Sequence, residues 1–256
     1  MEKVVKRLAD KVAIITGGAG SIGKTTAKLF LDNGAKVFLV DLNEDSLKKV
    51  ADDLGNKNIK YVAADVTKSE DVKRYVAEAV NAFGSIDIFF NNAGIEGVVK
   101  PTVDYPEDIF DKVIAVNVKG VFLGNKYVLP KMNDGGSIIL TASVSGIAGS
   151  PNVTAYIASK HAVVGMMRNL AIEVAPRNIR VNTINPSPVD NRMMRSLESG
   201  YNPDDAAGMK KAFENSIPLG RYADPIEIAQ LVQFLASDES KFITGTTQVI
   251  DGGMNA

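Results

Sequence analysis

Residues 12–24, VAIITGGAGSIGK, decide the fold of this chain. A short apolar run from Val12 to Thr16 leads into a glycine-rich turn, and the residues from Ser21 to Asn33 then show helical spacing. Glycines let the backbone turn tightly and approach a pyrophosphate closely, while the N-terminus of the next helix supplies N–H donors and a partial positive charge. In this strand–turn–helix context the pattern predicts a dinucleotide-binding βαβ unit. A tight turn without a ligand is the alternative.

Apolar strands and amphipathic helices continue to alternate almost to the end of the chain. Further strands are expected at residues 36–40, 59–64, 86–90, 137–141, 179–184 and 248–250, and helices at 21–33, 45–54, 69–83, 107–132, 155–175 and 225–236. Near-continuous apolar strands separated by helices are typical of a parallel sheet covered on both faces. The sequence therefore predicts an α/β Rossmann fold, a doubly wound parallel sheet of about seven strands, in a single domain over residues 1–256.

One long stretch, from Asn185 to about Gly220, has no clear period. A long irregular excursion from a compact domain is usually functional. We expect residues around 186–220 to form a lid over a substrate.

Composition disfavours several other classes of protein. Twenty-nine basic and 30 acidic residues give a net charge of −1, which does not suggest a nucleic-acid partner. With no cysteine and a single histidine, His161, neither a disulfide nor a zinc site is expected. The basic run from Met1 to Arg7 lacks the long apolar segment of a secretory signal, and no segment approaches the ~20 apolar residues of a membrane span. We expect a cytoplasmic protein without a metal site or a membrane partner.

The end of the second strand carries information about the cofactor. Asp41 follows Val40 eighteen residues after Gly23. A carboxylate at this place can accept hydrogen bonds from the adenosine ribose and repels a 2′-phosphate, which favours NAD over NADP. The nearest cation, Lys24, lies on the helix after the last glycine. A solvated strand-end carboxylate is the alternative reading of Asp41.

A second group of residues indicates proton chemistry. Tyr156 and Lys160 are four positions apart on a predicted helix, so both lie on one face of it. A free tyrosine titrates near pH 10, and a nearby ammonium or an oxidised nicotinamide ring favours the phenolate. Ser143 follows the fifth strand, residues 91–94 (NNAG) end the fourth, and Asn117 lies inside the long helix before the fifth. The carboxyl ends of parallel strands share one edge, so these groups should meet there.

Together these residues resemble the short-chain dehydrogenase/reductase family, and the resemblance covers nearly the whole chain. It rests on the turn after Thr16, Asp65-Val66, residues 91–94, Asn117, Ser143, Tyr156 with Lys160, Asn185-Pro186, Ile243-Thr244-Gly245 and Asp251-Gly252-Gly253.

The resemblance implies a role for each matching residue. Tyr156 would exchange a proton with the substrate oxygen, Ser143 would hydrogen-bond that oxygen, Lys160 would hold the nicotinamide ribose and depress the tyrosine pKa, and Asn117 would keep a water in a proton relay. Asp65 and Val66 would border the adenine, Asn92 would approach the adenosine ribose, and Val189 would contact the carboxamide through its backbone. The full set implied to bind the cofactor is Gly17, Gly20, Ser21, Ile22, Gly23, Asp41, Leu42, Asp65, Val66, Asn92, Ala93, Gly94, Tyr156, Lys160 and Val189.

Two departures from the family pattern stand out. Ser21 replaces the middle glycine of the turn, so that the glycines at 17, 20 and 23 fit the extended branch of sugar epimerases and dehydratases. The chain length and residues 91–94 match the shorter branch, which we expect here. In the loop after the sixth strand, Ser187 stands for a glycine and Asn191 for a threonine, which affects the carboxamide contact and leaves the proton chemistry untouched.

Three functions remain in competition. The first is an NAD-dependent dehydrogenase or reductase of a secondary alcohol/ketone pair, which the resemblance favours as a homotetramer paired through the helices at 107–132 and 155–175. The second is an NADPH-dependent reductase of a carrier-bound 3-oxoacyl group, and the third is a non-catalytic dinucleotide-binding regulatory protein. We expect the substrate pocket at residues 95–100, 144–150 and 186–215. Glu96 would face substrate there or be a solvated loop carboxylate, and His161 is expected to be packed or at an interface.

Overall fold

The computed structural model of the chain describes residues 6–256, and its centre is a seven-stranded sheet. The strand order is β3-β2-β1-β4-β5-β6-β7, and all neighbours are parallel. The strands are β1 (Val12–Thr16), β2 (Lys36–Asp41), β3 (Ile59–Ala63), β4 (Ile86–Asn91), β5 (Met132–Thr141), β6 (Arg180–Pro186) and β7 (Thr247–Ile250). This sheet confirms the predicted doubly wound α/β fold. Residues 1–5, the start of the basic N-terminal run, lie outside the described residues.

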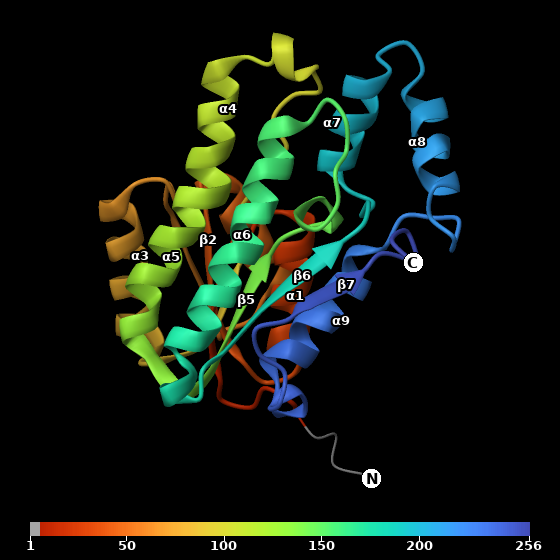
Figure 1. Cartoon of the computed structure of the whole chain (residues 1–256). Helices are drawn as coiled ribbons and strands as arrows, with labels where there is room; N and C mark the ends of the chain where they lie inside the picture. Colours follow the sequence, from red (N-terminus) through yellow and green to blue (C-terminus); the bar gives the residue numbers. More distant parts are fainter. Residues whose placement is uncertain (1–5) are drawn as a thin grey trace.

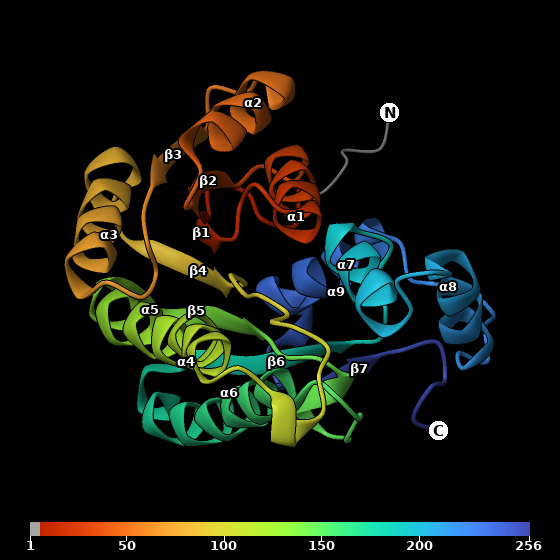
Figure 2. The ribbon, with the colours of Figure 1, turned by 90° about the horizontal axis from the view of Figure 1, so that it is seen from above.

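Helices cover both faces of the sheet, as Figures 1 and 2 show. Phe30 and Val232 belong to the core on one face, and Tyr75 and Val163 belong to the core on the other. None of the helices within residues 6–256 combines the length and apolar character needed to cross a bilayer. The first face carries α1 (Ser21–Asp32), α2 (Glu44–Leu54) and α9 (Pro225–Ala236), and the second carries α3 (Ser69–Phe83), α4 (Glu107–Ile114), α5 (Val121–Val128) and α6 (Thr154–Glu173).

The strand order reverses between β1 and β4, which pair directly with Ile14 opposite Phe89. On one side of this pair the sheet continues through β2 to β3, and on the other through β5 and β6 to β7. In open α/β sheets, ligands bind in the crevice beyond the carboxyl ends of the strands at such a reversal. The glycine-rich turn follows β1 and residues 91–94 end β4, so both lie at this point.

The prediction of one continuous helix over residues 107–132 is wrong, because the helix is interrupted and ends before Met132. A π-helical turn over Ala115–Gly120 separates α4 from α5, and a tight 3-10 turn over Leu129–Lys131 follows. Pro130 lies in this last turn and cannot continue an α-helix, since it lacks the N–H group. Strand β5 consequently begins at Met132, opposite Ile86, and its register against β4 shifts before Ser137.

The stretch predicted to be irregular contains two short helices, α7 (Arg192–Tyr201) and α8 (Ala206–Asn215). The side chain of Asn191 accepts from the N–H of Met194, and that of Asp205 accepts from the N–H of Gly208, so each helix has an N-cap. Each helix has only ten residues, fewer than the 11–18 residues over which a helical period is normally judged. Figure 1 shows both helices standing beyond the carboxyl end of β6. We call residues 186–220 the α7–α8 segment.

Candidate active site

The glycine-rich turn has the geometry of an anion-binding loop. Gly17 has a positive φ of +65°. Gly20 is the N-cap of α1 and has no side chain, so the first N–H groups of the helix have no capping partner from a side chain. A Cβ at Gly23 would collide with the carbonyl oxygen of Gly17, so only glycine lets the helix start this close to the turn. Ser21 is the first residue of α1, and the turn therefore accommodates a serine at this position.

Asp41 closes the cofactor side of the cavity. Its carboxylate accepts hydrogen bonds from the N–H of Ala19 (3.0 Å) and the N–H of Leu42 (2.8 Å), so it braces the turn as well as facing the cavity. Lys24 also lines this part of the cavity. An uncapped helix N-terminus, a glycine cradle and an acceptor one strand away fit a dinucleotide, whose pyrophosphate and ribose they would hold.

Thr16, Asn92 and Thr141 fasten the ends of β1, β4 and β5 to one another. The hydroxyl of Thr16 accepts from the N–H groups of Asn92 (2.9 Å) and Ala93 (3.1 Å), and the Asn92 amide donates to the Thr16 carbonyl (3.1 Å). The hydroxyl of Thr141 donates to the amide oxygen of Asn92 at 3.0 Å. These bonds hold the floor of the cavity rigid. The sequence did not indicate a role for Thr141, because only the folded sheet brings it next to Asn92.

Lys160 and Tyr156 meet at this floor, as predicted from their spacing. The ammonium of Lys160 donates to the carbonyl of Thr141 at 2.8 Å and lies 5.4 Å from the centre of the Tyr156 ring. Lys160 is 3% exposed, and this burial lowers its pKa to about 8. One ammonium proton is engaged with Thr141, which leaves two donors for other partners.

The protein surroundings raise the pKa of Tyr156, whereas the resemblance implied that Lys160 would lower it. Burial raises the pKa of Tyr156 to about 12, a hydrogen bond with Ser143 lowers it in part, and the negative charge of Glu96 raises it further. The Lys160 ammonium does not offset the effect of this desolvation on the pKa of Tyr156. The side chains alone thus favour the neutral phenol.

Ser143 is held at the carboxyl end of β5. Its hydroxyl donates to the carbonyl of Pro186 (3.4 Å) and accepts from the N–H of Ser145 (3.1 Å). The Asn185 amide donates to the Ser143 carbonyl at 2.6 Å. Ser143, and not Ser145, therefore provides the hydroxyl next to Tyr156.

Asn117 is fully buried in the π-helical turn and uses its amide completely within the protein. Its oxygen accepts from the N–H of Ile95 at 2.9 Å, and its nitrogen donates to the carbonyl of Ile95 (2.9 Å) and the hydroxyl of Ser159 (3.0 Å). The widened turn lets this side chain reach both the loop after β4 and helix α6. Asn117 thereby positions the helix that carries Tyr156 and Lys160.

A single cavity of about 830 Å³ brings most of the predicted residues together. The predicted residues in its lining are Gly17, Gly20, Ser21, Ile22, Asp41, Asn92, Ala93, Gly94, Ser143, Tyr156, Lys160 and Val189. The predicted residues outside this lining are Gly23, Leu42, Asp65, Val66 and Asn117.

The residues outside the lining serve the site in other ways or stand apart from it. The carboxylate of Asp65 accepts from the N–H (2.9 Å) and hydroxyl (2.7 Å) of Thr67 and shapes the loop after β3. Val66 lies against Gly120, where an added Cβ would approach its side chain to 2.9 Å. Leu42 is exposed beyond Asp41.

The far half of the cavity is built largely by the α7–α8 segment and combines apolar side chains with polar ones such as Arg192 and Asn255. Residues 144, 145 and 148–150 line it as expected, but the expected residues 95–100 do not. Sequence reasoning also missed a wall from the last strand's continuation, Met254 and Asn255. The apolar side chains of this half are Val144, Met193, Met194, Leu197, Phe213 and Met254.

Glu96 is neither a solvated carboxylate nor part of the lining. It is 7% exposed, and both of its oxygens accept from Arg192 at the start of α7, at 3.1 and 3.4 Å. Arg192 lines the cavity and covers this carboxylate. At the other end of α7, the hydroxyl of Tyr201 donates to the carbonyl of Pro151 at 2.8 Å. Helix α7 is thus fastened to the loops after β4 and β5. His161 is exposed on α6, so it is not packed within this chain, and a position at an interface stays a prediction.

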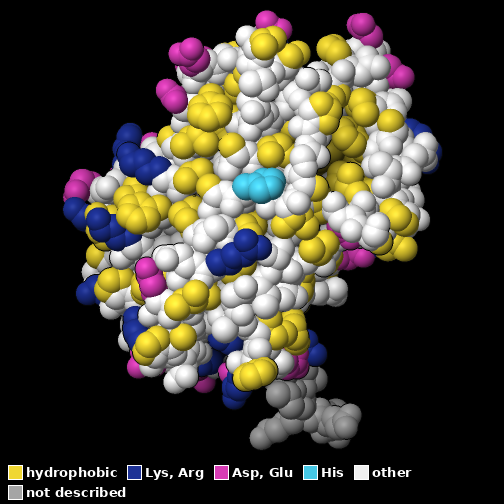
Figure 3. Space-filling model, viewed as in Figure 1, with side chains coloured by type: hydrophobic (Ala, Val, Ile, Leu, Met, Phe, Trp, Pro, Cys, Tyr) yellow, Lys and Arg dark blue, Asp and Glu magenta, His cyan; other side chains and the backbone are white. Residues whose placement is uncertain are grey.

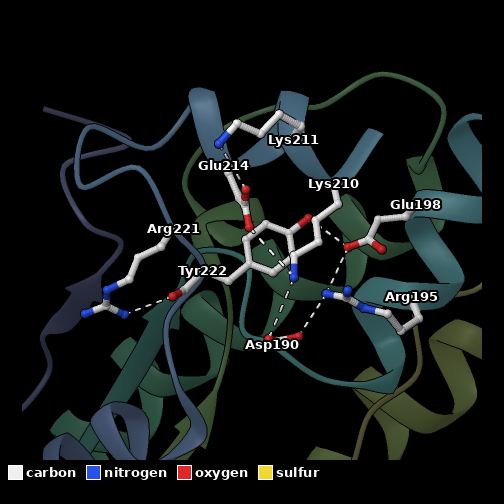
Figure 4. A network of polar contacts seen from close by, with 8 residues as sticks. All are labelled: Asp190, Arg195, Glu198, Lys210, Lys211, Glu214, Arg221 and Tyr222. Atoms are coloured by element: carbon white, nitrogen blue, oxygen red, sulfur yellow. Dashed lines mark hydrogen bonds and ion pairs between the residues drawn. The ribbon is translucent and has the colours of Figure 1, made fainter. Parts of the chain in front are cut away.

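A charged network joins α7, α8 and the loop before α9, as Figure 4 shows. The Tyr222 hydroxyl donates to Glu198 at 2.9 Å, and Arg195 lies 2.9 Å from Asp190 and 3.1 Å from Glu198. Both Glu198 and Tyr222 are buried, and the charge and hydrogen bond of Glu198 together with burial raise the pKa of this tyrosine. Lys210 extends the network to α8.

Comparisons with known proteins agree with this geometry. A family model described as enoyl-(acyl carrier protein) reductase matches residues 17–255. Levodione reductase of Leifsonia aquatica is 38% identical over 98% of this chain and 96% of its own, and the crystal structure of levodione reductase superposes with a TM-score of 0.93, covering 96% of this chain and 98% of that one.

Two further relatives differ from it in their named reaction. The 3-oxoacyl-(acyl-carrier-protein) reductase of Thermotoga maritima is 43% identical over 97% of this chain and 99% of its own. The structure of an NAD⁺-bound xylitol dehydrogenase is 35% identical, has a TM-score of 0.91, and covers 96% of this chain and 100% of that one.

Proposed function

The chain belongs to the short-chain dehydrogenase/reductase family, and from this membership we propose that it is an NAD-dependent oxidoreductase of a secondary alcohol/ketone pair with Tyr156 as the acid/base. The coarser part of this statement, a nicotinamide-dependent oxidoreductase acting on alcohols or ketones, follows from the family itself. One observation carries the finer part. The glycine turn, Asp41, Ser143, Tyr156 and Lys160 all line one continuous cavity.

In the proposed mechanism the protein positions the substrate oxygen and moves one proton. The Ser143 hydroxyl would turn from the Pro186 carbonyl to donate its hydrogen bond to that oxygen. The hydroxyl of Tyr156 gives its proton during reduction and takes one during oxidation. When bound, the cofactor supplies or accepts the hydride, and the positive charge of its oxidised ring favours the Tyr156 phenolate. Lys160, with one ammonium proton donated to Thr141, would hold the nicotinamide ribose through the other two.

The preference for NAD rests on Asp41. A 2′-phosphate at the adenosine ribose would lie beside this carboxylate, which already accepts two backbone N–H groups and is held in place by them. Lys24 lines the same part of the cavity and is the cation that could attract such a phosphate. We propose that repulsion of a 2′-phosphate by the Asp41 carboxylate outweighs its attraction to Lys24, because Asp41 ends the strand that would face the ribose.

The carrier-bound 3-oxoacyl reductase remains a second candidate, because the Thermotoga reductase of that name is 43% identical. An acidic carrier protein would need unpaired cations around the cavity mouth. The cations of the α7–α8 segment and of the loop after it pair with carboxylates: Arg192 with Glu96, Arg195 with Asp190 and Glu198, Lys210 and Lys211 with Glu214, and Arg221 with Glu227. This pairing favours a small-molecule substrate.

We also propose a single domain whose α7–α8 segment is the substrate lid, assembled into a homotetramer in the cytoplasm. Phe122 on α5 and Ile172 on α6 are exposed, and Figure 3 shows hydrophobic side chains between charged ones on the face that carries α4, α5 and α6. Burial of such a face in a partner is the usual use of exposed apolar surface. Sedimentation showing a monomer at micromolar concentration would contradict the tetramer.

The deciding experiment follows absorbance of the reduced nicotinamide with NAD and NADP separately, against secondary alcohols and diols. Wild type is compared with Tyr156→Phe, which retains the ring and removes the proton donor. Activity with NAD that is lost in the variant supports the proposal. Preference for NADP would favour the carrier-bound reductase, and dinucleotide binding without turnover of any substrate would favour a regulatory protein.

A further inference from the structure

Residues 251–255 form a rigid turn that the proposed mechanism does not use. One carboxylate oxygen of Asp251 accepts from the N–H of Gly253, and the other accepts from both the N–H and the side-chain amide of Asn255, each at 2.9 Å. Gly252 and Gly253 have φ of +62° and +90°, values that glycine adopts without strain. The turn is therefore held by its own hydrogen bonds.

The turn and Ile250, the strand residue just before it, are tied to both ends of the α7–α8 segment. The N–H of Ser187 donates to the carbonyl of Ile250 at 3.2 Å, and the N–H of Leu219 donates to the carbonyl of Gly252 at 3.2 Å. Met254 packs against the cluster of Met194, Ile217 and Tyr222 beneath α7. These hydrogen bonds and this packing thus fix the positions of Met254 and Asn255.

Both residues line the far half of the cavity. Met254 presents an apolar side chain there, beside those of α7 and α8. The orientation of the Asn255 amide is set by its neighbour, since a carboxylate only accepts and the nitrogen must face Asp251. The amide oxygen then points away from Asp251, and within residues 6–256 no protein donor bonds to it. Asn255 is exposed, so this wall of the cavity combines the apolar side chain of Met254 with an amide oxygen open both to solvent and to a ligand.

We propose that Met254 and Asn255 determine substrate specificity: the Asn255 amide oxygen accepts a hydrogen bond from a second hydroxyl group of the substrate, and Met254 limits the size of its carbon skeleton. The inference rests on the proposed function. It identifies the substrate class as a compact, largely apolar compound with a hydroxyl group besides the one that reacts.

The test uses cyclohexanol and the 1,2-, 1,3- and 1,4-cyclohexanediols as alcohols, with NAD. Asn255→Leu should lower the ratio of kcat/KM for the best diol to that for cyclohexanol about fivefold, which is the usual contribution of one hydrogen bond. Asn255→Ala keeps the backbone N–H bond to Asp251 and should do the same if the leucine variant folds poorly. Asn215→Leu, at an exposed position on α8, is the matched control and should leave the ratio unchanged.

Size selection is tested with 4-tert-butylcyclohexanol. Met254→Ala should raise its kcat/KM relative to cyclohexanol, whereas Met209→Ala, which alters a methionine outside the cavity lining, should not. Wild-type turnover with both ratios unchanged in the Asn255 and Met254 variants would overturn the inference and leave the proposed function standing. Failure of wild type to oxidise any of these alcohols would overturn the inference together with the proposed function for this substrate class.

Discussion

Replacing Arg192 with methionine should destabilise the protein more than replacing Glu96 with glutamine, although both changes break the same ion pair. Only 8% of the Glu96 side chain is exposed, against 76% of the Arg192 side chain. Arg192→Met leaves a charged carboxylate buried without a partner. Glu96→Gln leaves a neutral amide in the buried place and a guanidinium that solvent already reaches.

The magnitude follows from this asymmetry. Exposed pairs contribute about 0.2–1 kcal/mol, and loss of one partner from a fully buried pair costs about 3–5 kcal/mol. Because Arg192 is mostly in solvent, we expect about 2 kcal/mol for Arg192→Met and about 0.5 kcal/mol for Glu96→Gln. The double variant should cost less than Arg192→Met alone, since it removes the stranded charge.

Urea unfolding at pH 7, followed by circular dichroism, measures the three variants against wild type. Lys28→Met is the control, because the Lys28–Asp32 pair on α1 is exposed on both sides and its loss should cost less than about 0.5 kcal/mol. Equal costs for the two single variants, or a larger cost for Glu96→Gln, would refute the view that the buried carboxylate dominates this contact.

Three further outcomes are expected. Asp41→Ala should raise the ratio of NADP to NAD efficiency at least about tenfold, measured as kcat/KM with each cofactor, and an unchanged ratio would refute the role given to Asp41. Glu96→Gln removes a charge that raises the pKa of Tyr156, so the acid limb of the pH profile for alcohol oxidation should move to lower pH; a limb that stays or rises contradicts the electrostatic contact. Gly23→Ala should weaken NAD binding at least about tenfold, because the new Cβ collides with the turn, whereas Gly165→Ala on α6 meets no atom and should be neutral or stabilising by about 0.5–1 kcal/mol. Equilibrium titration and thermal unfolding distinguish the two glycine variants.

The order of elements and the contents of the cofactor side could be predicted from sequence because they depend on local patterns. The turn after β1, the four-residue spacing of Tyr156 and Lys160, and the strand-end position of Ser143 each constrain geometry within a few residues. Parallel strands then place these segments at one edge, so twelve predicted residues share one cavity lining. Helices α7 and α8 were not located from the sequence, because each has only ten residues and they lie in a stretch interrupted by prolines and glycines.

The ionisation of Tyr156 shows the limit of reasoning from spacing alone. A lysine four residues away indicated a lowered pKa for Tyr156. Burial instead raises the pKa of Tyr156 and lowers the pKa of Lys160. Desolvation depends on everything packed around a group, and no spacing in one helix reports it.

By itself the sequence determined the α/β fold, the family and the chemistry-bearing residues at the carboxyl ends of the strands, since each rests on hydrophobic period or on motifs read within one segment. Only the tertiary structure decided what lies opposite those residues. The Glu96–Arg192 pair joins residues 96 positions apart, the Asn117 amide joins two elements, and Met254 of the turn at 251–255 packs against the cluster that holds Met194 of α7. Contacts of this kind arise when packing brings distant segments together, and a one-dimensional pattern carries no record of them.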